Sequence, residues 1–83
     1  MTRDELRGAV IRQLRRLAPE TDPASLAGDA DWRDALDIDS LDFLNFIAAL
    51  RGDLGVDVPE ADYPRLATLR SCVDYLAGRL GLP

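Results

Sequence analysis

Apolar residues recur at helical spacing in three parts of this 83-residue chain, and no part shows the alternating pattern of a strand. The first repeat advances in steps of four, four and three residues and consists of Leu6, Val10, Leu14 and Leu17. Residues spaced in this way lie on one face of a helix, so we expect a helix over about residues 3–18, ended by Pro19. Another repeat follows the capping residue Thr68 and stops before Gly81; it consists of Leu69, Val73, Leu76 and Leu80.

The third repeat lies in the middle of the chain and follows Asp39, a residue type that caps helix starts well. We expect a helix from Ser40 to about Arg51, ended near Gly52 and Gly55. Its inward face is predicted to consist of Phe43, Phe46, Ile47, Leu50 and Leu54. A second apolar strip on another side consists of Leu41, Leu44 and Ala48. In so small a domain, a helix with two apolar sides must bury both or offer one to a partner.

The remaining segments complete an all-α prediction. Residues 19–39 lack a sustained period, which predicts a long loop anchored by apolar side chains: Leu26, Trp32, Leu36 and Ile38. Pro59 suits the start of a helical turn and Pro64 predicts its end, so we expect a short helix over residues 59–62. The predicted fold is a small four-helix bundle in one domain, 1–83, with three main helices, a short third helix and a long loop between helices one and two.

Charge is segregated along the chain and restricts the possible partners. The net charge is −5, but residues 1–19 carry +3 and residues 20–62 carry −10. An acidic middle opposes binding to nucleic acid and anionic membranes and attracts basic protein surfaces. No apolar run approaches the roughly 20 residues that a membrane span needs, and the charged start does not resemble a secretory signal. We therefore expect a cytoplasmic monomer that binds neither nucleic acid nor membrane.

Catalytic and metal-binding chemistry is poorly represented. The chain has no His and no Lys, so Ser40 has no partner base of the kind that activates a catalytic serine. The lone Cys72 cannot form an intramolecular disulfide or a zinc site and is expected in the core. A calcium loop starting at Asp31 fails because Arg33 and Ala35 stand at ligand positions. We predict no catalytic residue and no metal site, and interpret Ser40 as a residue that another enzyme modifies.

Several features together resemble the acyl carrier protein family over nearly the whole chain. Asp39-Ser40-Leu41 opens the middle helix, a long loop precedes it, and a Val-Asp-Val-Pro turn, a short helix and a Thr-capped last helix follow. The resemblance implies a 4′-phosphopantetheine arm on Ser40, transferred from coenzyme A by a phosphopantetheinyl transferase, with Asp39 and Leu41 as motif residues. The arm carries acyl groups as thioesters between partner enzymes of the ligase, ketosynthase or acyltransferase type. The chain itself is then not an enzyme.

The resemblance also implies that the middle helix docks partner enzymes through an acidic and apolar face. Carried over to this chain, the docking positions are Leu41, Asp42, Leu44, Asn45, Ala48 and Arg51, with Glu60 and Asp62 beyond the helix. The family usually has acids at the positions of Asn45 and Arg51-Gly52, and Gly at the position of Asp37. Because the docking helix is less acidic than usual, we expect a specialised fatty-acid, polyketide or other secondary pathway rather than a housekeeping one.

Alternatives remain open at several points. A stand-alone aminoacyl carrier can also have Asp before its serine, and an unmodified helical interaction module could keep the fold without the arm. Asp39 and Asp42 could dock basic surfaces or share a divalent ion in the transferase complex, or they could serve only as cap and first-turn residues. Phe43 and Phe46 are expected to pack in the core rather than against cargo, since both belong to the inward face.

Overall fold

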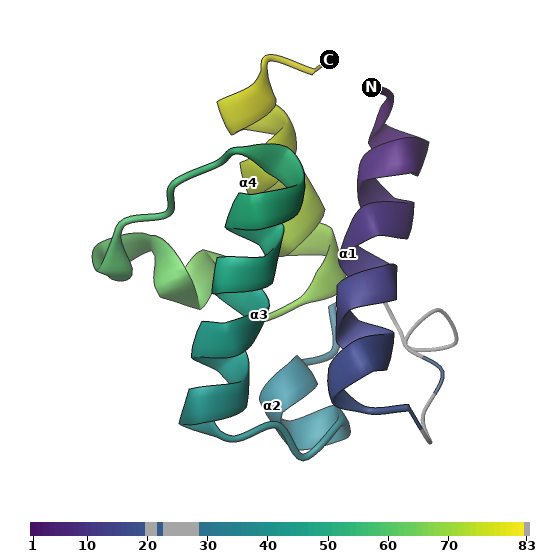
Figure 1. Cartoon of the computed structure of the whole chain (residues 1–83), viewed down its shortest axis with the longest axis vertical. Helices are drawn as coiled ribbons and strands as arrows, with labels where there is room; N and C mark the ends of the chain where they lie inside the picture. The colour runs from purple at the N-terminus through teal and green to yellow at the C-terminus, as the bar shows by residue number, and fades with distance from the viewer. Residues whose placement is uncertain (20–21, 23–28, 83) are drawn as a thin grey trace.

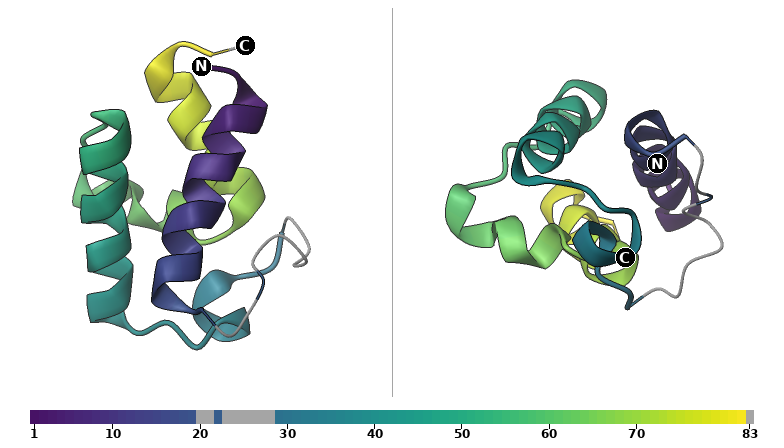
Figure 2. Two further views of the ribbon diagram at one scale, coloured as in Figure 1. Left: turned by 45° about the vertical axis from the view of Figure 1, so that its right-hand side comes forward. Right: turned by 90° about the horizontal axis from the view of Figure 1, so that it is seen from below.

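The computed structural model describes residues 1–19, 22 and 29–82, and these form a helical bundle (Figure 1). Its α-helices are α1 (Arg3–Leu17), α2 (Trp32–Ala35), α3 (Ser40–Leu54) and α4 (Leu69–Leu80), and a 3₁₀ helix, η2 (Glu60–Leu66), precedes α4. Helix α1 packs against α3 and α4, whereas η2 packs against α4. The start of α3 lies at the same end of the bundle as α2, opposite the start of α1 (Figures 1 and 2).

The three long helices begin and end close to the predicted positions because their caps are local. Thr2 and Glu5 form a reciprocal capping box at the start of α1. The Thr68 hydroxyl accepts the Ser71 N–H at 3.1 Å to start α4, which ends at Gly81 in the left-handed region. The all-α prediction and the capping roles of Asp39 and Thr68 are therefore confirmed.

Helix α3 runs three residues beyond the predicted end at Arg51. Gly52 does not stop it, because one glycine inside a helix costs only about 1 kcal/mol relative to alanine. Asp53, which follows Gly52, is held by a tertiary contact: the Gln13 side chain on α1 donates to its carboxylate at 2.6 Å. The helix ends at Gly55, whose φ of 69° is left-handed and whose N–H donates to the Arg51 carbonyl at 2.8 Å.

The prediction that Pro64 ends the short third helix is wrong. Helix η2 continues through Pro64 to Leu66. A 3₁₀ helix is built from separate i→i+3 bonds, and a proline inside it removes only the bond that its own N–H would make. The Pro64 carbonyl still accepts the Ala67 N–H at 3.3 Å, and Leu66 is fully buried. Burial of Leu66 therefore favours a second turn that the sequence pattern alone does not indicate.

One turn of helix, α2, lies within the segment predicted as a long loop. Trp32 opens it and is only 1% exposed, with its ring edge-on to Phe46 at 5.3 Å between centroids. The Trp32 N–H donates to the Ala67 carbonyl at 2.9 Å, beside an antiparallel bridge that pairs Asp31 with Thr68. Trp32, Leu36 and Ile38 are thus buried anchors as predicted, and the predicted anchor Leu26 lies outside the described residues.

The core lies among α1, α3 and α4 and contains the inward positions of each helix. Phe43, Phe46, Ile47 and Leu50 of α3 are buried, as is Cys72 of α4, and Leu54 is partly buried against them. The predicted inward face of α3 and the core position of Cys72 are confirmed. The core therefore uses one side of α3 and leaves the other for the surface that carries Ser40.

Candidate functional site at the start of helix α3

Ser40 is the first residue of α3 and is exposed to solvent. The preceding Asp39 has an extended backbone, and its carboxylate accepts the Asp42 N–H at 2.8 Å. The Asp39 carbonyl also accepts the Phe43 N–H at 3.0 Å, which closes the first turn. Asp39 therefore acts as the helix cap, and this turn holds Ser40 at the positive end of the α3 dipole.

The backbone two residues before the cap adopts an uncommon conformation. Asp37 has a φ of 54°, in the left-handed region that glycine enters without steric cost. Aspartate is one of the few other residue types that visit this region regularly. Asp37 therefore adopts, at the turn into α3, a backbone conformation that the expected glycine would also adopt.

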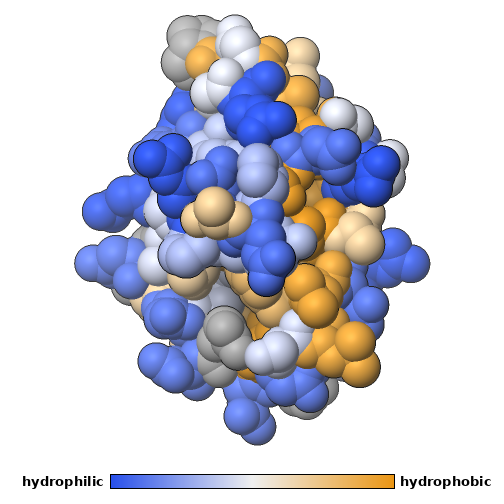
Figure 3. Space-filling view, turned by 90° about the vertical axis from the view of Figure 1, so that its left-hand side faces the viewer, coloured by the Kyte–Doolittle hydropathy of each residue, from blue (hydrophilic) through white to orange (hydrophobic). Residues whose placement is uncertain are grey.

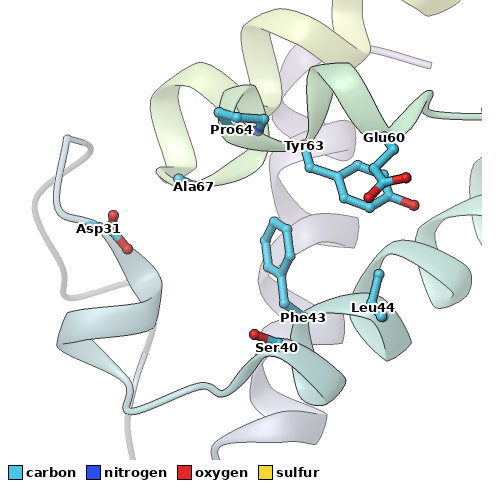
Figure 4. Close-up of a pocket in the computed structure, with 8 residues that line it drawn as sticks. All are labelled: Asp31, Ser40, Phe43, Leu44, Glu60, Tyr63, Pro64 and Ala67. Carbon is cyan, nitrogen blue, oxygen red and sulfur yellow. The ribbon is translucent and has the colours of Figure 1, made fainter.

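An open groove of about 580 Å³ lies beside Ser40, between α3 and η2 (Figure 4). Its lining comes from three parts of the chain that are far apart in sequence: the segment before α2, the first turns of α3, and η2 with the residue that follows it. The lining residues are Asp31, Ser40, Phe43, Leu44, Glu60, Tyr63, Pro64 and Ala67.

The groove has an aromatic floor and carboxylates near its edges. The rings of Phe43 and Tyr63 meet edge to face, with centroids 6.2 Å apart and an interplanar angle of 80°. Figure 4 shows Phe43 directed from α3 toward Pro64, with Ser40 nearer the open side that faces Asp31. Phe43 is a core residue as predicted, but it also lines this groove, whereas Phe46 packs against Trp32.

The predicted docking residues of α3 share an exposed side that begins at the serine. Leu41 is 66% exposed and Leu44 is 48% exposed, and Asn45 and Ala48 are exposed too. Figure 3 shows a band of apolar side chains among charged ones on the face of the molecule where η2 lies. Arg51 is eleven residues from Ser40, which is about 16 Å along a helix. Its guanidinium pairs with Asp57 at 3.2 Å, so the structure places it at the far end of this surface.

The acids of η2 occupy two different environments. Glu60 is exposed and lines the groove with Ser40 and Leu44. Asp62 is half-buried and accepts a hydrogen bond from the Tyr75 hydroxyl of α4 at 2.7 Å. Asp42, also half-buried, follows Ser40 in the first turn of α3. The structure therefore places Glu60 at the groove that Ser40 also lines, and it joins Asp62 to the neighbouring helix by a hydrogen bond.

Sequence reasoning gave no site role to five residues that line the groove: Asp31, Phe43, Tyr63, Pro64 and Ala67. Tyr63 is an aromatic residue in a polar stretch, a signal that could have attracted attention. Nothing in the sequence indicates that Ala67 and Asp31 approach the same cavity. They meet because backbone contacts join the segment before α2 to the start of α4, which is a tertiary feature.

Other reactive groups in the described residues offer little chemistry. Burial raises the pKa of the Cys72 thiol well above its ordinary value, so the thiolate does not form at neutral pH. Within residues 1–19, 22 and 29–82, acidic and sulfur side chains form no cluster suited to a metal ion. In the same part of the chain, every helix is too short or too polar to cross a bilayer. The exposed Ser40 hydroxyl beside the groove is the feature that remains.

Comparisons with known proteins identify the family of the chain. A family model described as a phosphopantetheine attachment site matches residues 4–76. The chain is 33% identical over 72 residues to polyketide-8 synthase acyl carrier protein 2 of Streptomyces avermitilis, with 83% of each protein covered. It is 29% identical over 59 residues to an acyl carrier protein of Thermosynechococcus vestitus, which covers 71% of this chain and 73% of that protein. An acyl carrier protein of Lactobacillus acidophilus is 27% identical over 62 residues, covering 75% and 78%.

Proposed function

Because the chain belongs to the phosphopantetheine attachment family of acyl carrier proteins, whose cofactor is 4′-phosphopantetheine, we propose that Ser40 is the residue that bears this arm. The observation that carries the proposal is the placement of Ser40, an exposed hydroxyl on the first residue of α3 beside an open groove. A phosphodiester at this position meets the positive end of the helix dipole. The residues present therefore fit the group.

The chain supplies the accepting hydroxyl and a fixed backbone, and partner enzymes supply the catalysis. In the attachment step the Ser40 Oγ forms a bond to the phosphorus of coenzyme A that carries the pantetheine. The P–O bond to the nucleotide breaks, and adenosine 3′,5′-bisphosphate leaves. The serine proton passes to a base of the transferase, since this chain contains neither His nor Lys. Once attached, the arm offers a terminal thiol that holds an acyl group as a thioester. Carriers of this family are not catalysts themselves.

The exposed side of α3 is the proposed docking surface for the transferase and for acyl-loading and acyl-processing enzymes. Leu41, Leu44 and Ala48 offer apolar area, and Asp42 and Glu60 offer negative charge to basic partner surfaces. Electrostatic attraction mainly accelerates encounter, whereas small contact areas keep each complex weak. Weak binding and fast release suit a carrier that must visit several enzymes in turn.

We also propose that residues 1–83 act as one carrier domain, monomeric and cytoplasmic, in a specialised fatty-acid, polyketide or other secondary pathway. Two features support the pathway class. Asn45 and Arg51-Gly52 make the docking helix less acidic than that of a housekeeping carrier, and one relative is named as a polyketide synthase carrier. Efficient replacement of a fatty-acid carrier in a reconstituted fatty-acid synthesis assay contradicts this assignment, whereas poor turnover with full phosphopantetheine loading supports it.

The attachment site is tested by incubating the protein with coenzyme A and a broad-specificity phosphopantetheinyl transferase, followed by intact mass measurement. Wild type is expected to gain one phosphopantetheine, Ser40→Ala none, and the matched control Ser71→Ala one. A thiol assay of the native protein, freed of coenzyme A, provides a second readout, because the protein's own Cys72 is buried and its thiol pKa is raised. This assay is expected to detect no thiol on the protein before the reaction and one after it. Failure of folded wild type to gain mass with several transferases contradicts the proposal and favours an unmodified interaction module.

A further inference from the structure

Helix η2 forms one wall of the groove beside Ser40, yet its position is set chiefly by α4. It packs against α4 and buries Leu66 in the core. Its start at Pro59 has no side-chain cap, and Pro64 removes one of its internal hydrogen bonds. A short 3₁₀ helix has little stability of its own. Contacts to α4 must therefore determine where η2 lies relative to the serine.

The hydroxyl of Tyr75 joins α4 to η2 and has a hydrogen-bond partner on each of these two helices. This hydroxyl donates to Asp62 Oδ2 at 2.7 Å and accepts from Arg79 Nη1 at 2.9 Å. The guanidinium carbons of Arg65 on η2 and Arg79 on α4 lie 5.9 Å and 5.8 Å from the centre of the Tyr75 ring. Tyr75 thus contacts η2 through both its hydroxyl and its ring.

The same network reaches the end of α3 through the loop before η2. Arg79 Nη2 donates to the Asp57 carbonyl at 2.9 Å, and the Asp57 carboxylate pairs with Arg51 Nε at 3.2 Å. The network therefore links α4 to η2 through Asp62 and to the loop through Asp57. Asp57 in turn links the loop to Arg51 of α3. The hydroxyl of Tyr75 stands at its centre, where the contacts to η2 and to the loop meet.

We propose that Tyr75 is a positioning residue that acts through Asp62 to hold η2, and with it Glu60 and Tyr63, in the arrangement that partner enzymes meet beside Ser40. The proposal rests on the function proposed above and adds to it the element that keeps the docking surface in shape. Tyr75 lies on α4 and does not line the groove, so its effect on docking is indirect.

Two physical arguments favour a local role over a contribution to global stability. The Arg51–Asp57 pair and Arg79 are exposed, and exposed polar networks of this kind add little to folding free energy. A segment with weak internal bonding opens locally before the bundle unfolds, so loss of one tether acts on that segment first. Desolvation and the hydrogen bond to Asp62 raise the pKa of Tyr75, which keeps the hydroxyl protonated and able to donate at neutral pH.

Tyr75→Phe tests the proposal because it removes the hydroxyl and keeps the ring. With the transferase and coenzyme A, KM for the Tyr75→Phe carrier is expected to rise about three- to tenfold, the equivalent of one lost hydrogen bond, with kcat unchanged. Backbone amides of residues 60–63, 65 and 66 in the unmodified protein are expected to shift in NMR spectra and to exchange faster with solvent. The matched control is Arg15→Gln on α1, which breaks an exposed ion pair with Asp22 and is expected to leave KM unchanged.

A double-mutant cycle separates the positioning role from a merely structural one. If Tyr75 acts through Asp62, Tyr75→Phe has no further effect on KM in an Asp62→Ala background. Asp62→Asn keeps an acceptor oxygen for the Tyr75 hydroxyl, so its KM is expected to stay close to the wild-type value. Additive effects of the two substitutions contradict the proposal.

The possible failures are distinguishable. Absence of any mass gain on wild type contradicts the proposed attachment function, whatever Tyr75 does. Normal modification of wild type, with an unchanged KM for Tyr75→Phe and unchanged amides at residues 60–63, 65 and 66, contradicts the positioning role alone.

Discussion

The two sides of α3 contain similar apolar residues and have opposite roles. On the inward side, Phe46 and Leu50 are almost fully buried against α1, α2 and α4. On the outward side, Leu41 and Leu44 remain largely exposed beside Ser40. Burial of a large apolar side chain contributes about 1.5–3 kcal/mol to folding, so the inward side stabilises the bundle. The outward side contributes little of this burial, and it is the surface that we propose for partner docking.

Polar contacts follow the same division. Asp53, near the end of α3, bonds to the buried Gln13 and joins the helix to α1. Asp39, at its start, accepts hydrogen bonds from Asp42 and Phe43 within its own turn, beside the open groove. The comparison shows that one helix can be rigidly packed along one side while its other side forms an open groove with η2. Three variant proteins test this division and the turn that leads into α3.

Phe46→Ala addresses the inward side and is expected to have the largest effect. It removes a ring that packs edge-on to Trp32 and leaves a cavity, which typically costs about 3–5 kcal/mol. Small domains are stable by only about 5–15 kcal/mol, so a large fall in the urea midpoint is expected. Asn45→Ala, the exposed neighbour, is the control and should change stability by less than about 0.5 kcal/mol. Equal effects of the two substitutions contradict the division of α3 into two sides.

Leu41→Ser combined with Leu44→Ser addresses the outward side. Both side chains are exposed, so the free energy of unfolding is expected to change by less than about 1 kcal/mol. The transferase loses apolar contact area, and KM for the carrier is expected to rise about tenfold or more. Steady-state kinetics and urea unfolding of the same protein give the two values. A large loss of stability with an unchanged KM reverses the roles assigned to the two sides.

Asp37→Gly addresses the turn before α3 and is expected to have the smallest effect of the three variants. Glycine adopts a φ of 54° without steric cost, which stabilises the folded chain. Its greater conformational entropy in the unfolded chain offsets part of this stabilisation. We expect the free energy of unfolding to rise by up to about 1 kcal/mol, with an unchanged urea m-value. Ser40 modification should keep its wild-type KM. A clear loss of stability shows instead that the Asp37 side chain contributes to the turn.

Local signals were sufficient for most of the fold. The capping residues Asp39 and Thr68, the terminal Gly81 and the helical repeats predict α1, α3 and α4 to within a few residues, because they act over one or two turns. The sequence did not predict helix α2 or the length of η2. Each contains a residue buried in the core: Trp32, which contacts the distant Phe46 and Ala67, and Leu66.

The candidate site was predicted in part for the same reason. The Asp-Ser-Leu motif at a helix start predicts Ser40 and its neighbours in α3. The helical rotation of 100° per residue predicts the exposed strip. The groove did not follow, because Asp31, Tyr63 and Ala67 meet Ser40 only after backbone contacts join the segment before α2 to α4. Whether Ser40 bears the arm stays a prediction until the mass measurement is made.

By itself, the sequence determined the helical class, the approximate limits of the long helices, the two apolar sides of α3 and the lack of any His or Lys. These properties depend on spacing, capping and residue type, which act locally along the chain. Tertiary structure alone decided the course of η2, the left-handed turn at Asp37, the groove beside Ser40 and the tether from Tyr75 to Asp62. The physical reason is that each of these depends on burial or hydrogen bonding in the folded chain, between residues that local pattern does not relate.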